Sequence, residues 1–151
     1  MILTLDLGTH CGWAFNDRNG DISHGTEHFD GHVRHGPALR WLQFRSFLSQ
    51  KGLSINTVYY EDVRRHVGTD AAHVYGGFLA LLQIYAHVNN ARLVGVGVGV
   101  IKKHWTGKGN ASKDLMIAAA IERGFKPVDD NAADALALLS YALEQEELAP
   151  F

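Results

Sequence analysis

Residues 2–15 read ILTLDLGTHCGWAF and carry the clearest structural pattern of the sequence. The apolar, partly β-branched start of this stretch ends at Asp6 and is followed by glycines, which predicts a buried strand and a tight turn. A second strand is expected at residues 13–15, and Asn19-Gly20 is a typical hairpin turn into a third, antiparallel strand. This part of the chain therefore predicts a three-stranded antiparallel unit.

Helical and strand patterns alternate in the rest of the chain. Apolar residues recur at helical spacing after Gly36-Pro37 and again over residues 70–88. Short apolar runs predict two further strands, one that ends at Glu61 and one over residues 93–98. Two more helices are expected at roughly 112–122 and 130–146. The order of elements predicts one α/β domain in which helices cover a mixed sheet.

Length and composition are those of an ordinary globular domain. The chain has 151 residues, of which 46% are hydrophobic and 20% are charged. Its single cysteine, Cys11, cannot form an internal disulfide, which fits a reducing cytosol. The sequence contains no signal-peptide pattern and no apolar stretch of the roughly 18 residues that cross a membrane. We therefore expect a soluble protein of the cytoplasm.

The charges are unevenly distributed along the chain, although the net charge is only −2. Residues 1–31 contain five acids and one base, and residues 127–151 contain six acids and no base. Residues 32–126 contain thirteen Lys and Arg against five acids, a local excess of eight positive charges. This distribution suits an enzyme that gathers carboxylates around metal ions and presents basic residues to phosphate. Chance patterning on a solvated surface is the alternative.

Three acids occupy positions where an open α/β sheet would collect ligands. Asp6 and Glu61 each end a predicted strand, and Asp134 lies one turn into the last predicted helix. Together they could hold Mg²⁺, which prefers carboxylate oxygens and retained water. Taken singly, each is equally explained as a turn former or a helix cap. Glu61 is the most informative, because an acid directly after a buried run is costly unless it is paired or binds a metal.

Four motifs, in this order along the chain, resemble those of RuvC-type Holliday-junction resolvases of the RNase H-like superfamily. They are residues 2–9 with Gly12-Trp13-Ala14, residues 60–63, residues 100–113 and residues 130–137. The resemblance extends over nearly the whole chain. Residues 106–113 and 129–131 are more similar to the phage-encoded branch than to the cellular one.

The resemblance implies a fold and an activity. The fold is a mixed five-stranded sheet in the order 3-2-1-4-5, flanked by helices. The activity is hydrolysis of four-way or other branched DNA, with Asp6, Glu61 and Asp134 holding two Mg²⁺ or Mn²⁺ ions. The resemblance further implies a homodimer that uses no small-molecule cofactor and has no contact with a membrane. A phage-encoded member would act in the cytoplasm of its bacterial host.

Two departures from the family pattern concern the site. Many members have an acid or His three residues before the last Asp, where this chain has Asn131. Either Asn131 or Asp130, which lies on the same helical face as Asp134, would then be the fourth ligand. Members also present an aromatic residue shortly after the second acid. This chain has Arg64 and Arg65 there, which we expect to contact phosphate.

The motif at residues 100–113 contains a run of lysines with no acid between them. Lys102, Lys103, Lys108 and Lys113 are interrupted by Gly107 and Gly109, which predicts a flexible cationic segment that opens a helix. Lysines and helix-start N–H groups both bind phosphate, so all four are expected to contact DNA. The resemblance assigns Lys102 and Lys113 an assisting role in catalysis. A solvated surface loop is the plain alternative.

Three other functions share parts of this pattern. The Asp-Leu-Gly-Thr stretch at residues 6–9 also opens actin-type ATPases and sugar kinases, but those proteins are far longer and need a second, matching domain. A junction-binding protein that no longer cuts would fit Asn131. A nuclease for other branched or RNA-containing duplexes is equally compatible with the sequence, since the choice of four-way DNA rests on family resemblance.

Overall fold

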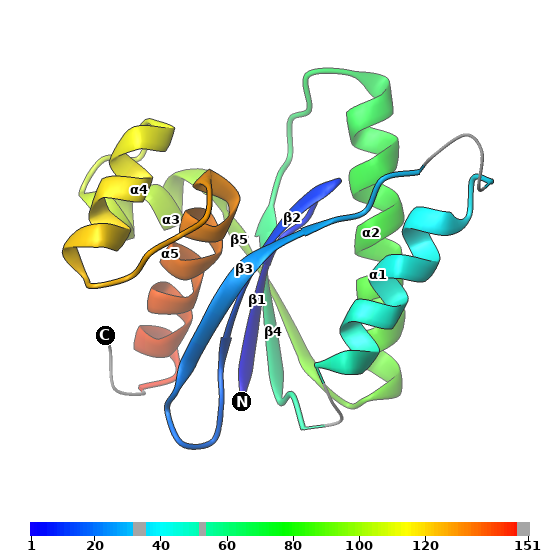
Figure 1. Ribbon diagram of the computed structural model, residues 1–151, viewed down its shortest axis with the longest axis horizontal. Coiled ribbons are helices and arrows are strands. Elements are labelled where there is room, and N and C mark those ends of the chain that lie inside the picture. The colour runs from blue at the N-terminus through cyan, green and yellow to red at the C-terminus, as the bar shows by residue number, and fades with distance from the viewer. Residues whose placement is uncertain (32–35, 52–53, 148–151) are drawn as a thin grey trace.

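A five-stranded sheet forms the centre of the computed structural model, which describes residues 1–31, 36–51 and 54–147 (Figure 1). The strands are β1 (Ile2–Asp6), β2 (His10–Asn16), β3 (Ile22–His28), β4 (Thr57–Asp62) and β5 (Arg92–Gly97). Their order in the sheet is β3-β2-β1-β4-β5. The first three strands are antiparallel, whereas β1, β4 and β5 run parallel to each other. The predicted α/β class and the sheet order 3-2-1-4-5 are both confirmed.

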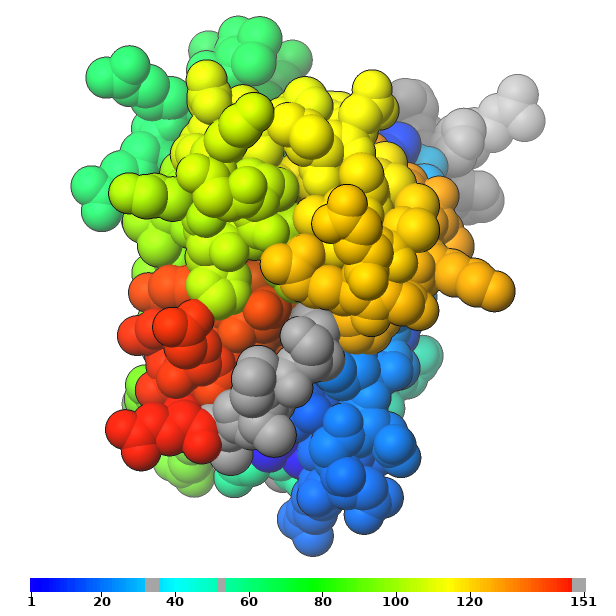
Figure 2. Space-filling model, turned by 90° about the vertical axis from the view of Figure 1, so that its left-hand side faces the viewer, coloured from blue at the N-terminus to red at the C-terminus, as the bar shows by residue number. Residues whose placement is uncertain are grey.

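Helices cover both faces of the sheet, which gives three layers (Figure 1). The helices are α1 (Leu39–Gln50), α2 (Thr69–Val88), α3 (Val98–Thr106), α4 (Lys113–Glu122) and α5 (Asp130–Gln145). In Figure 1, α1 and α2 lie on one side of the sheet and α3, α4 and α5 on the other. Figure 2 looks onto this second side, where α3 and α4 are outermost and the end of α5 emerges below them. Within the described ranges, no helix combines the length and the apolar character that crossing a membrane requires.

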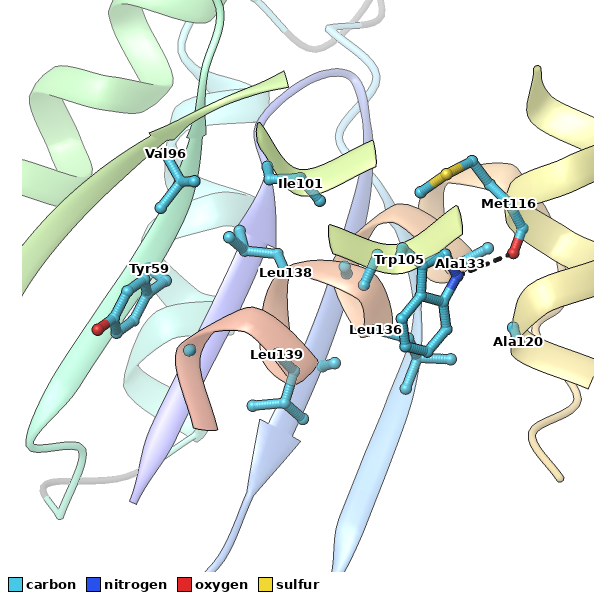
Figure 3. Close-up of a cluster of buried hydrophobic side chains, with 14 of the residues drawn as sticks. Tyr59, Val96, Ile101, Trp105, Met116, Ala120, Ala133, Leu136, Leu138 and Leu139 are labelled. Carbon is cyan, nitrogen blue, oxygen red and sulfur yellow. Dashed lines mark hydrogen bonds between the residues drawn. The ribbon is translucent and has the colours of Figure 1, made fainter. Parts of the chain in front are cut away.

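Residues 98–106 form the helix α3, so the prediction of a flexible cationic segment is wrong for this part of the lysine run. Ile101 and Trp105 lie one turn apart and are buried, and the indole Nε1 of Trp105 donates to the carbonyl of Met116 at 3.1 Å (Figure 3). Gly107 ends the helix with a positive φ of 80°, and its N–H bonds the carbonyl of Lys103 at 2.8 Å. Lys102 and Lys103 are therefore carried by a helix.

The α5 helix is buried on almost every side, because it lies between the sheet and the pair α3 and α4. Its alanines at 132, 133, 135 and 137 bring its backbone close to the sheet, and Leu136, Leu138 and Leu139 fill the core (Figure 3). A second core, which includes Phe44, Phe78 and Leu82, lies between the sheet and the helices α1 and α2. The α5 helix is therefore packed against the sheet over the strands β1 and β2.

Candidate active site

The carboxyl ends of β1 and β4 bring the first two predicted acids next to each other. Leu5 pairs with Tyr60 in the parallel ladder, so Asp6 at the end of β1 is the neighbour of Glu61 in β4. The Glu61 carboxyl is close enough to Asp6 to raise the pKa of Asp6. On the other side of Glu61, the Tyr75 hydroxyl from α2 donates to the Glu61 carbonyl at 2.8 Å. Tyr75 thus fixes the end of β4, a role that the sequence did not reveal.

The α5 helix supplies the other two acids. Asp130 and Asp134 lie one turn apart at the start of α5, on one helical face. The buried hydroxyl of Thr4 in β1 donates to the carbonyl of Ala135 at 2.8 Å, which holds this part of α5 against β1. Thr4 and Asp6 lie two residues apart in the strand and face the same side of the sheet. Asp6 therefore faces the turn of α5 that carries Asp134.

The pKa values of these carboxyls record their burial and mutual repulsion. The pKa of Asp6 is raised well above its ordinary value, first by burial and then by the charges of Glu61, Asp134 and Asp130. The pKa of Asp134 is raised to about 7 by burial and by the charge of Glu61, although Lys102 and Lys113 partly offset this. Four acids therefore share one partly buried site in which like charges are unfavourable.

The donor set fits a divalent cation. Asp134 Oδ1 is buried and has no hydrogen-bond partner within the described part of the chain, which is costly unless a cation contacts it. Carboxylate oxygens are the ligands of hard ions such as Mg²⁺ and Mn²⁺. Among residues 1–31, 36–51 and 54–147, no group of three or more His, Cys, Asp or Glu side chains is arranged so that it could hold a metal ion. Mg²⁺ in particular is usually held by one or two carboxylates together with water and substrate phosphate.

Asp130 and Asn131, the two candidates for the fourth ligand, are placed differently. Asp130 lies close enough to raise the pKa of both Asp6 and Asp134, and its Oδ2 is 2.5 Å from the ammonium of Lys113. The side chain of Asn131 hydrogen-bonds to Asp129 instead. The structure therefore brings Asp130 to the other carboxylates.

The first turn of α5 approaches the sheet where the sheet has no side chain. A Cβ at Gly12 of β2 would lie 1.9 Å from the carbonyl oxygen of Asn131. Gly12 pairs with Asp6 on one side and with Thr26 on the other, so the three residues form one row across the sheet. Sequence reasoning used Gly12 only as part of a motif and missed this close approach.

Asp129 caps the start of α5 and is held by β3. Its Oδ1 accepts hydrogen bonds from the Ala132 N–H at 2.9 Å and from the Thr26 hydroxyl at 2.6 Å. Burial alone would raise the pKa of Asp129, but the bonds from Thr26, Ala132 and Asn131, together with the charge of His28, lower it. Asp129 is therefore a structural carboxylate, distinct from the four that repel each other.

The predicted basic residues divide into two groups. Lys113 and Lys102 are close enough to lower the pKa of Asp134, and the Lys102 ammonium donates to the Ala111 carbonyl at 3.1 Å. The remaining four, Lys103, Lys108, Arg64 and Arg65, are exposed. Arg64 lies 3.3 Å from Asp62 and Lys103 is in the last turn of α3. The structure thus brings two lysines to the carboxylates and leaves the other four cations at the surface.

A hollow of about 440 Å³ lies on the side of α1 and α2, between these helices and the segments that follow β1 and β4. Its walls include residues 7–9, directly after Asp6, and Val63, directly after β4. Arg40 and His66 provide basic groups on its rim, and the His66 ring packs on the Tyr75 ring with centroids 4.8 Å apart. No sequence pattern indicated this hollow, because its walls come from four separate parts of the chain.

Comparisons with known proteins give a structural likeness only. No family model and no curated protein sequence matches the chain. Three solved structures have a similar fold over most of the chain. Thermus thermophilus RuvC in complex with a Holliday junction substrate has a TM-score of 0.76 and 18% identity, over 97% of this chain and 94% of that one. A second Thermus thermophilus RuvC structure has a TM-score of 0.64 and 17% identity, over 99% and 98%. The yeast mitochondrial Holliday junction resolvase has a TM-score of 0.59 and 14% identity, over 91% and 75%.

These values define the class of fold. The sheet order and the helices on both faces are those of an RNase H-like domain. Within that class the chain has the fold of the RuvC resolvases, as the resemblance of its sequence motifs predicted. At 14–18% identity the likeness extends to the fold and not to the activity.

Proposed function

We propose that the protein is a divalent-metal-dependent endonuclease that resolves branched DNA, with the four-way junction as its substrate. The observation that carries the proposal is the convergence of Asp6, Glu61, Asp130 and Asp134, with one buried carboxylate oxygen lacking a partner. Two lysines, Lys102 and Lys113, accompany these carboxylates, and lysine ammonium groups can stabilise the charge that develops on a reacting phosphate. The fold likeness includes a RuvC bound to a Holliday junction substrate, which supports this class of DNA.

Each acid has a proposed role. Asp6, Glu61 and Asp134 would hold two Mg²⁺ or Mn²⁺ ions, with Asp130 as the fourth ligand. Two such ions would activate the attacking water and stabilise the leaving 3′ oxygen of a phosphodiester. Lys113 is bound to Asp130 and is 78% exposed, so its ammonium is available to a phosphate that approaches the acids. Lys102 lies deeper and would reduce the repulsion around Asp134.

The exposed cations would bind the DNA backbone. Lys103 lies in the last turn of α3 and Lys108 just after it, while Arg64 and Arg65 follow β4, so both pairs lie between Glu61 and Asp130 in the sequence. Such contacts position the substrate and make its affinity depend on salt. We propose that these four residues, together with Lys102 and Lys113, hold the strand to be cut.

A twofold homodimer is part of the proposal, because resolution of a four-way junction requires two symmetric cuts. Ile84 and Val88 lie one turn apart on α2 and are 61% and 70% exposed. Leu42 of α1 is 55% exposed. Exposed apolar side chains on these helices support a partner subunit on this side. A monomer at working concentration in light scattering would count against the dimer.

The test compares a synthetic four-way junction with a linear duplex of the same sequence, in Mg²⁺ and in EDTA. We expect paired, ligatable nicks in the junction that require the metal and that Asp6→Asn abolishes. The control is Asp21→Asn, because Asp21 lies in the exposed turn between β2 and β3. Tight binding of the junction without cutting in either Mg²⁺ or Mn²⁺ would identify a non-cleaving binder. Cutting of other structures but not of the four-way junction would refute the substrate and retain the nuclease.

A further inference from the structure

The start of α5 is tethered to three neighbouring strands at points that bracket its two acids. Thr26 of β3 bonds the side chain of residue 129 at 2.6 Å. Gly12 of β2 meets the backbone of residue 131, and Thr4 of β1 bonds the carbonyl of residue 135 at 2.8 Å. Asp130 and Asp134 lie between these points. The position of both acids over the sheet is therefore set by three short polar or steric contacts.

Thr26 lies in the same row as the first carboxylate. Asp6, Gly12 and Thr26 are paired in register across β1, β2 and β3, so their side-chain positions face the same side of the sheet. Because Gly12 has no side chain, the turn of α5 fits between Asp6 and Thr26. A shift of this turn along the row would change the separation of Asp6 from Asp134.

The apolar core does not fix this separation by itself. The rest of α5 is anchored by ten buried residues from Ala132 to Leu143, so the helix remains docked without the Thr26 contact. Apolar packing is non-directional, whereas a hydrogen bond of 2.6 Å defines a direction and a distance. The Thr26 hydroxyl is thus suited to set the fine position of the turn.

We propose that Thr26 is a positioning residue of the metal site, acting through Asp129 on the turn that carries Asp130 and Asp134. It lies on the edge strand and touches none of the four acids. The inference rests on the proposed function, because it assigns Thr26 to the metal site proposed above. Residues that orient metal ligands from outside the ligand set change metal affinity by about 10- to 100-fold when they are removed.

Three variants test the proposal. Thr26→Val removes the hydroxyl and keeps the shape, and Thr26→Ser keeps the hydroxyl. The matched control is Tyr59→Phe, because the Tyr59 hydroxyl of β4 donates to Glu146 at 2.6 Å just past the other end of α5. Mn²⁺ binding is followed by electron paramagnetic resonance of the free ion. Hydrogen exchange of the Ala132 and Ala133 amides reports on the first turn without any metal.

We expect Thr26→Val to weaken Mn²⁺ binding about tenfold or more and to accelerate exchange at Ala132 and Ala133. Thr26→Ser should have the Mn²⁺ affinity and the exchange rates of the wild type. Tyr59→Phe should change neither the Mn²⁺ affinity nor the exchange rates, although it should lower Tm by a few degrees, as Thr26→Val does. Unchanged exchange in Thr26→Val would overturn the proposal, as would an equal loss of Mn²⁺ affinity in Tyr59→Phe. If the wild type binds no Mn²⁺, the proposed function fails and the metal role of Thr26 fails with it. Faster exchange in Thr26→Val would in that case still establish the anchoring of the turn.

Discussion

Replacing Asp134 by Asn should stabilise the metal-free protein, even though it removes a residue of the proposed site. Asp134 is mostly buried among other acids, and its pKa is raised from 3.8 to about 7. At pH 8 the folded chain must therefore ionise Asp134 in surroundings that disfavour the charge. Asn has nearly the same shape and carries no charge.

The magnitude follows from the pKa. Each pH unit by which a folded-state pKa exceeds the unfolded one corresponds to about 1.4 kcal/mol. About three such units give an upper limit of about 4 kcal/mol, and coupling to the other acids reduces it. We expect Asp134→Asn to raise the free energy of unfolding by about 2–4 kcal/mol at pH 8 in EDTA.

The pH dependence has a definite sign. Below the unfolded pKa, Asp134 is neutral in both states and costs nothing. Between pH 4 and pH 7 the unfolded chain releases the proton while the folded chain retains it, so the stability of the wild type falls as pH rises. Above pH 7 both states are ionised at Asp134, so the wild type has lost all of this contribution to its free energy of unfolding. The advantage of Asp134→Asn should therefore disappear as pH is lowered from 8 to 4.

Urea denaturation followed by tryptophan fluorescence measures this difference, because the chain contains three tryptophans. Asp21→Asn in the exposed turn should shift the free energy of unfolding by no more than about 0.5 kcal/mol. Excess Mg²⁺ should stabilise the wild type and not Asp134→Asn, by about 2.7 kcal/mol at one hundred times the dissociation constant. Equal stability of wild type and Asp134→Asn at pH 8 in EDTA would refute the reasoning.

Three further changes have defined outcomes. Gly12→Ala places a Cβ 1.9 Å from the carbonyl oxygen of Asn131, so we expect about a 100-fold loss of junction cleavage in a gel assay. The control is Gly97→Ala, which should cleave normally because a Cβ at Gly97 would have no atom within 4 Å. Lys103→Ala should weaken junction binding uniformly across sequences and reduce the salt slope of the binding constant by about one in a fluorescence titration. Thr4→Val removes the buried hydroxyl that bonds Ala135 and should lower the free energy of unfolding by about 1 kcal/mol in urea denaturation; an unchanged value would show that this bond contributes nothing.

The sheet and most helices could be predicted because their patterns are local. The run that ends at Asp6, the turn at Asn19-Gly20 and the spacing over residues 70–88 each encode one element within a few residues. The α3 helix was missed because it has nine residues and only two buried apolar ones, Ile101 and Trp105. Its stability comes from packing against α4 and α5, which no local pattern contains.

The site was predictable only in part, because some of its contacts join residues that are far apart in the sequence. Asp6 and Glu61 lie at the carboxyl ends of strands, and this local feature places them at one edge of the sheet. Thr26 and Asp129 are separated by 103 residues, so their contact exists only once α5 has docked. Asp130 and Asn131 are adjacent in the chain and point about 100° apart on a helix. Only the rotation of α5 on the sheet decides which of them meets the other acids.

The positions of the acids at the start of α5 explain why the charge of Asp134 is the least favourable of them in the folded protein. Asp129 and Asp130 lie at the N-terminus, where the helix dipole and unpaired N–H groups favour negative charge. Asp130 also has Lys113 as a partner at 2.5 Å. Asp134 lies beyond the first turn, where the dipole no longer helps, and its Oδ1 is buried without a partner. Of the two acids that α5 contributes to the site, Asp134 is therefore the one whose charge most requires a bound cation. A protein selected for stability alone would have an uncharged residue at this position.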